Sequence, residues 1–329
     1  MQCPHPIPYT DLLALDTPNR LRVAAIDFLN PAPLMWDFEH APHNAALAQH
    51  YSIHYTLPSR CADELLSGRA DLGLIPIASL TPALAVVPGC TIASLDRVRS
   101  IQLIVKIRPG PLRPFGTWHR APDTPQALAS THTAKSAAPE SVLRAVRTVA
   151  ADTASRSSLA YAQILFRKFV GIDPDFIPAA AHPAAMLARA DAALLIGDPA
   201  LLALEDRERI EAVAGPCLWL DLAHEWRTRT GLPWVAAVWA VRSEALAGID
   251  ASRLIADLQH SRDRGLANID ALVREWTPRI AIPPATIHGY LTRNIHYTLS
   301  PECIDAIQLF RRYATEADIL PPLPHLSFL

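Results

Sequence analysis

The residue with the clearest chemical potential is Asn30, which follows a short apolar run, Arg22-Val-Ala-Ala-Ile-Asp-Phe-Leu. We expect this run to be a strand that leads into a helix, so that Asn30 lies at the carboxyl end of a sheet, where open α/β folds bind ligands. An asparagine amide both donates and accepts hydrogen bonds, but it cannot abstract a proton at neutral pH. Asn30 is therefore predicted to recognise or polarise a ligand. Capping of the following helix is the simpler alternative.

A second polar stretch, residues 152–158, follows a predicted strand that ends at Ala151 and opens a helix that runs to about Val170. Three of its hydroxyl side chains, Ser155, Ser157 and Ser158, lie within four residues. Hydroxyls at the head of a helix cap free backbone N–H groups, and those N–H groups also suit a carboxylate or phosphate. One serine suffices as a cap, so the stretch predicts either a capped helix or an anion site.

Two further positions are ambiguous. Ser100 lies near the start of an expected strand, Arg99–Ile107, where a serine is unremarkable. Asp198 precedes Pro199 at another strand-to-helix junction, and aspartate is common there as a turn or cap residue. The sequence contains no GxGxxG, GxxxxGK[ST], GxSxG or HExxH motif, so nucleotide-dependent, serine-hydrolase and zinc-peptidase chemistry have no positive support.

Composition sets the frame for these residues. The chain has 329 residues, half of them hydrophobic, which is long enough for about two domains. Its 30 basic and 32 acidic residues leave a net charge of −2, so we expect no nucleic-acid partner. The apolar runs are shorter than the about 20 residues of a membrane helix. The N-terminus has no apolar signal region, and the five cysteines show no CxxC spacing, which favours a cytoplasmic protein with reduced thiols.

The pattern of apolar residues predicts alternating strands and helices in the first third of the chain, and hence a largely parallel sheet. The expected strands are Leu21–Ile26, Tyr51–Thr56 and Asp71–Ile75, and the expected helices are Ala32–His40, Arg60–Ser67 and one from about Pro76. Residues 108–140 hold six of the 30 prolines and are predicted to be a flexible surface insertion. The later expected elements are strands at Arg144–Ala151, Asp191–Ile196 and Pro233–Val241 and helices at Asp221–Arg229, 250–266, 268–276, 283–293 and 301–314.

Six stretches of the sequence, in order, resemble the motifs of the chorismate dehydratase family, which opens the futalosine route of menaquinone biosynthesis. They are residues 22–30, Gly68-Arg-Ala-Asp-Leu-Gly-Leu-Ile75, Arg99-Ser-Ile-Gln-Leu103, Thr153-Ala-Ser-Arg-Ser-Ser158, Ala193-Leu-Leu-Ile-Gly-Asp198, and Trp226 through Thr230-Gly-Leu-Pro233. The resemblance spans roughly 20–106 and 145–245.

This resemblance implies an α/β fold of the type II periplasmic-binding-protein kind, with two α/β lobes around a central cleft. Lobe 1 would comprise residues 20–106 plus 232–329. Lobe 2 would comprise residues 107–231, including the Pro/Ala-rich insertion at 108–140. The chain would cross between the lobes near 100–107 and 231–240.

The resemblance also implies the reaction, a cofactor-independent and metal-free loss of water from chorismate that gives 3-[(1-carboxyvinyl)oxy]benzoate. Asn30 and Ser100 would then be catalytic. Substrate binding would fall to a set of residues in the second half of the sequence: Thr153, Ser155, Arg156, Ser157, Ser158 and Asp198. None of these is a competent base, so we expect the enolpyruvyl carboxylate of the substrate to take the proton. The implied assembly is a monomer or homodimer.

Three other readings are open. The sister enzyme of the same route, 1,4-dihydroxy-6-naphthoate synthase, shares the implied fold, but its first strand ends differently. A non-catalytic solute-binding protein would need export, and no signal region is evident. A regulatory ligand-binding domain would usually carry a helix-turn-helix segment, and none is recognisable.

Overall fold

The computed structural model describes residues 20–107, 137–248 and 250–329, and the strands in these ranges form two separate sheets. The first sheet has the order β11-β4-β10-β3-β1-β2, and β12 also pairs with β4. Its strands are β1 (Leu21–Ile26), β2 (Tyr51–Thr56), β3 (Leu72–Pro76), β4 (Leu84–Ser94), β10 (Trp234–Arg242), β11 (His296–Thr298) and β12 (Ser327–Phe328). β1 lies parallel to β2 and β3, whereas β10 is antiparallel to β3 and β4.

The second sheet is built entirely from the middle of the chain, in the order β7-β6-β8-β5-β9. Its strands are β5 (Ile101–Lys106), β6 (Thr148–Ala151), β7 (Asp175–Pro178), β8 (Ala192–Ile196) and β9 (Cys217–Asp221). β6 is parallel to its neighbours β7 and β8, and β5 is antiparallel to β8 and β9. The chain therefore leaves the first sheet after β4 and returns to it at β10.

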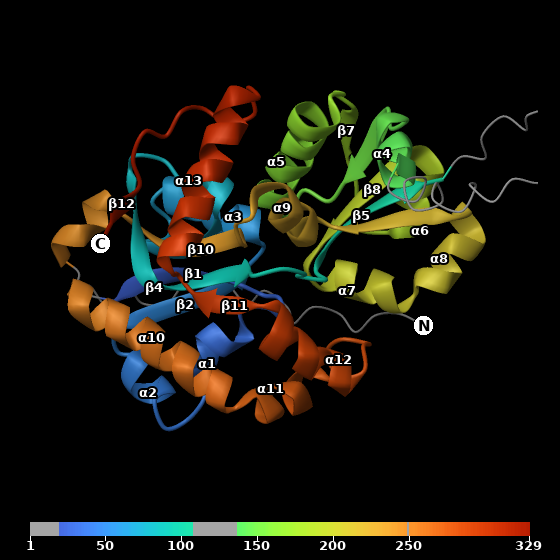
Figure 1. The fold of residues 1–329 in the computed structure, drawn as a ribbon. Helices are drawn as coiled ribbons and strands as arrows, with labels where there is room; N and C mark the ends of the chain where they lie inside the picture. The colour runs from blue at the N-terminus through green and yellow to red at the C-terminus, as the bar shows by residue number, and fades with distance from the viewer. Residues whose placement is uncertain (1–19, 108–136, 249) are drawn as a thin grey trace, which may run out of the picture.

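Helices cover both sheets, and Figure 1 shows the two lobes side by side with α5 and α9 where they meet. The helices that accompany the first sheet are α1 (Trp36–Glu39), α2 (Asn44–Leu47), α3 (Pro58–Leu66), α10 (Ala251–Ala267), α11 (Ile269–Trp276), α12 (Pro284–Gly289) and α13 (Pro301–Glu316). Those of the second are α4 (Ala137–Arg144), α5 (Arg156–Ile164), α6 (Pro183–Arg189), α7 (Gly197–Glu205), α8 (Arg207–Ala214) and α9 (Leu222–Thr230). Short 3-10 or π turns add η1 (Ala32–Met35), η2 (Ile77–Ser79), η3 (Leu165–Val170), η4 (Ser243–Gly248) and η5 (Tyr290–Asn294).

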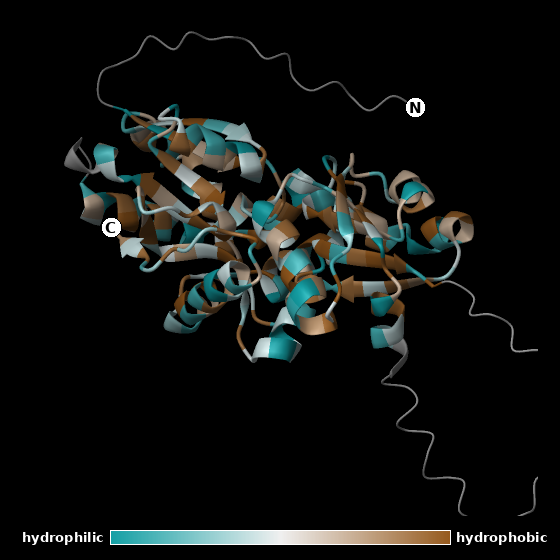
Figure 2. Ribbon diagram, turned by 90° about the horizontal axis from the view of Figure 1, so that it is seen from above, coloured by the Kyte–Doolittle hydropathy of each residue, from teal (hydrophilic) through white to brown (hydrophobic). Residues whose placement is uncertain are grey.

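The helices form because each has one apolar face for the core. In α3 the buried residues Pro58, Cys61, Ala62 and Leu65 recur at the spacing of one helical face. This face of α3 packs against the strands of the first sheet, of which β3 is buried along its whole length. In Figure 2 the strands are mostly hydrophobic, while the outer helices mix hydrophilic and hydrophobic residues.

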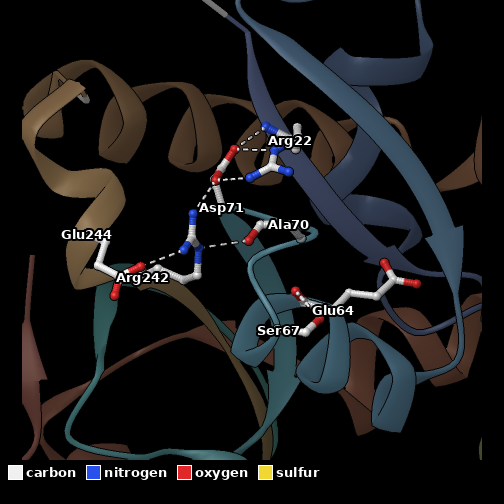
Figure 3. A network of polar contacts seen from close by, with 7 residues as sticks. All are labelled: Arg22, Glu64, Ser67, Ala70, Asp71, Arg242 and Glu244. Carbon is white, nitrogen blue, oxygen red and sulfur yellow. Dashed lines mark hydrogen bonds and ion pairs between the residues drawn. The ribbon is translucent and has the colours of Figure 1, made fainter. Parts of the chain in front are cut away.

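An ion-pair network fixes the strand order at one end of the first sheet (Figure 3). Asp71, just before β3, accepts hydrogen bonds from the Arg22 guanidinium on β1 at 2.7 and 2.9 Å, and from Arg242 on β10 at 2.9 Å. Burial alone would raise the pKa of Asp71, but these arginines outweigh it and lower the pKa to about 2. One carboxylate thus holds three neighbouring strands together.

Several predicted elements differ from the structure. The helix predicted from about Pro76 is only the short η2 turn, and the chain then forms β4. The β-branched residues of β4 favour a strand. Its Pro88 and Gly89 are accommodated by a register shift against β10. The predicted strand 144–151 is shorter, since α4 ends at Arg144. Residues 137–140 of the predicted insertion belong to α4, and 108–136 lie outside the described residues.

The predicted lobe boundary is misplaced for one strand. β5 was expected in lobe 1, yet it is a central strand of the second sheet. The two crossings are accordingly shorter than expected and lie at 95–100, between β4 and β5, and at 231–233, between α9 and β10. No helix within the described ranges is long and apolar enough to span a membrane.

Candidate functional site

A cavity lies where the lobes meet, at the carboxyl ends of β1 and β3 and beside both crossings. Its lining comes from both sheets: Ile26, Phe28, Asn30, Pro58, Pro76, Ile92, Ala93, Val98, Ser100, Ile101, Ser155, Ser158, Ile196, Gly197, Trp234, Ala236 and Ala237. The empty volume is about 530 Å³ when the space at its open mouth is included, and the interior is narrow. None of these lining side chains is charged, and most are apolar.

Four polar side chains face this apolar hollow, and all four were predicted as site residues: Asn30, Ser100, Ser155 and Ser158. They come from segments far apart in sequence, one in lobe 1 and three at or beyond the first crossing. A hydrogen bond in such a water-poor setting is stronger than the same bond in bulk water. The arrangement can therefore orient and polarise a small molecule that carries hydrogen-bond acceptors.

Asn30 does not cap a helix. The turn that follows it, η1, has Pro31 at its N-cap position and no side-chain capping bond. The Oδ1 atom of Asn30 is buried and has no partner among the described residues. A buried amide oxygen without a partner is unusual, because leaving it unpaired costs about 1–3 kcal/mol. Its position on the cavity wall makes a ligand donor the natural partner.

Ser100 is held from two sides. Asp221 accepts the backbone N–H groups of Val98 at 3.2 Å and Arg99 at 2.6 Å, and so clamps the first crossing. Arg99 has a φ of 63°, a left-handed conformation that is uncommon for a residue with a side chain. The Ser100 hydroxyl, almost fully buried, accepts a hydrogen bond of 2.8 Å from the phenol of Tyr290. Both position and rotamer of this serine are thereby restricted.

The first turns of two helices of lobe 2 also reach the cavity. Ser155 is the N-cap of α5, and its Oγ accepts the Ser158 N–H at 3.4 Å and lies 3.2 Å from the Ser158 Oγ. Gly197, the first residue of α7, lines the opposite part of the wall. The N-terminus of a helix carries partial positive charge, so both helices favour an anionic group in the cavity. Ser155 therefore both caps α5 and lines the cavity.

Four predicted substrate-binding residues do not line the cavity. Thr153 is exposed, and Arg156 pairs with Asp63 of α3 at 2.7 Å. The Ser157 hydroxyl is already occupied, since it donates to the Ala236 carbonyl at 2.8 Å and accepts the Ala78 N–H at 3.3 Å. Residues 153, 156 and 157 are thus absent from the cavity wall, and their role in substrate binding stays a prediction.

Asp198, the fourth of these, lies beside the cavity rather than on its wall. Its Oδ1 accepts the backbone N–H of Leu29 at 3.1 Å, which joins α7 of lobe 2 to the segment that carries Asn30. Burial raises the pKa of Asp198 to about 6. This carboxylate acts as a bridge between the lobes.

Further contacts close the cleft around the cavity. The Ser59 N–H donates to the Ala154 carbonyl at 3.0 Å, and the Arg156–Asp63 ion pair lies near it. On the other side, a Cβ at Gly197 would lie 2.8 Å from the ring of Phe28, so the lobes touch there without room for a side chain. These contacts hold the two lobes together around the cavity.

Some site residues were not predicted from the sequence. Gly197 follows a predicted strand, and a glycine at a strand-to-helix junction was an available signal. Trp234 lines the cavity from the start of β10, where it reads as an ordinary core residue. Tyr290 and Asp221 act on Ser100 across 190 and 121 positions in sequence, and no local pattern indicates such pairs. Within the described ranges, no three His, Cys, Asp or Glu side chains gather as metal ligands would.

Two α/β lobes, joined by two crossings around an interlobe cavity, form a periplasmic-binding-protein-like fold. A protein of Archaeoglobus fulgidus has the same fold, with a TM-score of 0.63 at 11% identity over 92% of this chain and 98% of its own. The periplasmic aliphatic sulphonate binding protein of Escherichia coli matches with a TM-score of 0.58 at 13% identity, over 95% of this chain and 94% of its own.

Sequence comparison identifies the family. A model of the menaquinone biosynthesis family matches residues 21–114 and 127–316, and the chain belongs to that family. A chorismate dehydratase of Thermus thermophilus is 25% identical over 283 residues, which are 83% of this chain and 87% of the relative. The family resemblance seen in the sequence motifs is confirmed.

Proposed function

We propose that this chain is a chorismate dehydratase, a carbon–oxygen lyase that converts chorismate into 3-[(1-carboxyvinyl)oxy]benzoate in menaquinone biosynthesis. Family membership and the Thermus thermophilus relative support this assignment. The observation that carries it is the meeting of Asn30 and Ser100, from different lobes, in one uncharged cavity that two helix N-termini face. The N–H groups of these two helix N-termini would favour the carboxylates of chorismate.

The elimination proceeds in two steps. A base removes the proton from the ring carbon that bears the ether oxygen, and the electron pair passes through the diene to the ring carboxylate. The neighbouring hydroxyl group then takes up the proton that the base removed and leaves as water, and the ring becomes aromatic. Negative charge develops on the ring carboxylate between the steps, so donors aimed at it lower the barrier. Ser155, Ser158 and the first turn of α5, which line the cavity, would supply them.

The base in this proposal is the substrate itself. No Asp, Glu, His, Lys or Arg is among the residues that line the cavity, and neither an amide nor a serine hydroxyl abstracts protons at neutral pH. The enolpyruvyl group of chorismate is joined to the same ring carbon through the ether oxygen, so its carboxylate can reach the proton on that carbon. Ser100 and the Nδ2–H group of Asn30 would hold that carboxylate in the reactive pose, which leaves the Asn30 Oδ1 for a donor of the substrate. A chorismate analogue without this carboxylate should bind but not react.

The direct test is incubation of the purified chain with chorismate and no additive, followed by mass spectrometry. We expect chorismate to lose the mass of one water molecule and the product to show the absorption of a substituted benzoate. Binding of chorismate without turnover would instead favour the non-catalytic binding role that the fold also permits. Conversion to a different product would contradict the assignment.

A further inference from the structure

Among the described residues, the hydroxyl of Tyr290 makes the one side-chain hydrogen bond to Ser100. Tyr290 begins η5, a π turn near the C-terminal end of lobe 1, and its side chain is 1% exposed. Its phenol donates to the Ser100 Oγ at 2.8 Å. The last residue of the same turn, Asn294, donates to the Arg97 carbonyl at 2.9 Å. The η5 turn thus forms hydrogen bonds with the first crossing on both sides of Arg99, the residue with a positive φ.

The direction of this hydrogen bond determines what Ser100 can do. A phenol is a stronger acid than an aliphatic alcohol, and it is the better donor of the two. Burial holds the pKa of Tyr290 well above its usual value, so the phenol keeps its proton at every working pH. Because the Ser100 oxygen accepts a hydrogen bond from the Tyr290 hydroxyl, the hydroxyl hydrogen of Ser100 must point away from Tyr290. The cavity that Ser100 lines lies in that direction.

We propose that Tyr290 is a positioning residue that makes Ser100 a hydrogen-bond donor towards the substrate. This inference rests on the proposed function and adds to it a role for a residue remote in sequence. A hydroxyl that already accepts one hydrogen bond is also polarised into a better donor. The pair therefore presents a directed, strengthened O–H to the carboxylate that Ser100 holds, without any change in charge.

The test is Tyr290→Phe, which removes one oxygen atom and retains the ring. We expect kcat for chorismate to fall about tenfold, because a neutral hydrogen bond that stabilises the transition state contributes about this factor. KM should change by less than about twofold. Ser100→Ala should be slower still, and the double variant should be no slower than Ser100→Ala alone. This non-additivity separates positioning of Ser100 from a merely structural role.

Tyr297→Phe is the matched control. Tyr297 is also buried, but its hydroxyl has no partner among the described residues, so its loss should leave kcat unchanged. Full activity of Tyr290→Phe would overturn the inference, as would losses that multiply in the double variant. If wild-type protein does not convert chorismate, the proposed function fails and this inference with it. An active wild type with an unaffected variant removes the inference alone.

If Tyr290→Phe lowers the melting temperature enough to obscure the kinetics, 3-fluorotyrosine at position 290 replaces it. This side chain keeps the ring and the hydroxyl and is a stronger donor. We expect kcat to stay at or above the wild-type value, and a marked fall in kcat would contradict the role of Tyr290 as donor.

Discussion

At the scale of single residues, the site is made of few polar groups in apolar surroundings. Asn30 and Ser100 face a wall of hydrophobic side chains, where few waters compete for their hydrogen bonds. Preorganised donors in such a setting stabilise developing charge without the cost of reorienting solvent. The buried Oδ1 of Asn30 has no partner among the described residues, so it is available to a hydrogen-bond donor.

Replacement of Asn30 by alanine tests this view. Loss of one preorganised donor of this kind typically slows the chemical step by about 10²–10³-fold. We therefore expect Asn30→Ala to lower kcat by about this factor and to leave circular dichroism and melting temperature near those of the wild type.

Asn44→Ala provides the comparison, because Asn44 starts α2 and bonds only to nearby backbone groups. Its steady-state kinetics should match the wild type. An Asn30→Ala variant with more than about a tenth of wild-type kcat would show that the amide has no role in the reaction.

Asp198 leads to a prediction about pH and stability. Burial raises its pKa to about 6 in the folded chain, against about 3.9 in an unfolded one. Between these values the folded state binds more protons than the unfolded state, so the free energy of unfolding falls as pH rises from about 4 to 6. Asp198→Asn keeps an acceptor for the Leu29 N–H and removes the charge.

We expect Asp198→Asn to be more stable than wild type by about 2–3 kcal/mol at pH 7 and nearly equal to it near pH 4. Denaturant titrations at several pH values measure the difference. Asp206→Asn, at an exposed position near the end of α7, should follow the wild-type curve. A constant difference across this pH range would contradict the assigned pKa.

How far the site was predictable depends on the kind of signal. Asn30 and Ser155 lie at strand-to-helix junctions, and this local pattern was enough to place them. Arg156 and Ser157 share the same junction, but helix geometry turns them towards Asp63 and Ala236. Which of these side chains lines the cavity depends on the rotation of about 100° per residue along the helix and on partners from the other lobe. This choice could not be made from the sequence alone.

At the scale of elements, α10 determines where the Asn30 segment lies. Gly265 of this helix packs directly on the backbone of Pro33 in η1, and Ser261 donates to the Leu34 carbonyl at 2.8 Å. Arg264 pairs with the buried carboxylate of Asp37. These contacts hold the segment that follows Asn30 against a helix from the far end of the chain.

A methyl group at position 265 would collide with backbone atoms of Pro33, which cannot move aside. We expect Gly265→Ala to lower the free energy of unfolding by about 2 kcal/mol or more, despite the better helix propensity of alanine. Gly289→Ala is the matched substitution, since its Cβ would meet only the movable end of Arg293. Equal stability of the two variants in thermal unfolding would refute the packing argument.

The Asp71 network supports the opposite end of the same sheet. The lowered pKa of Asp71 means that its stabilisation is complete above about pH 4 and is lost as pH falls towards 2. We expect Asp71→Asn to lower the free energy of unfolding by about 1–2 kcal/mol at pH 7, with the difference shrinking below pH 4. Asp173→Asn, at an exposed ion pair with Arg167, should change stability by less than about 0.5 kcal/mol. A pH-independent effect of Asp71→Asn would argue against the ion pairs.

The elements with strong periodicity were predicted well, and those shaped by partners were not. Strands β1 and β2 have the predicted bounds, and α10 and α13 lie within a few residues of theirs. β4 was missed because its helix-like start and its Pro-Gly break obscure a strand that only pairing with β10 stabilises. The allocation of β5 to the second sheet likewise depends on neighbours 90 and 115 positions away.

At the scale of the whole molecule, the two lobes close over the candidate site. Hydrogen bonds and ion pairs cross the cleft on both sides of the cavity, from Leu29 to Asp198 and from Asp63 to Arg156. The cavity wall is mostly apolar, and hydrogen-bond donors act most strongly in such surroundings. The contacts between the lobes therefore keep Asn30 and Ser100 at one cavity.

The most direct test is a crystal structure of the chain with 3-[(1-carboxyvinyl)oxy]benzoate bound. The ring is expected between Asn30 and Ser100, with its carboxylate at the first turn of α5 and the enolpyruvyl carboxylate against Asn30. Electron density for the ligand elsewhere, or a ring that contacts neither residue 30 nor residue 100, would contradict the account.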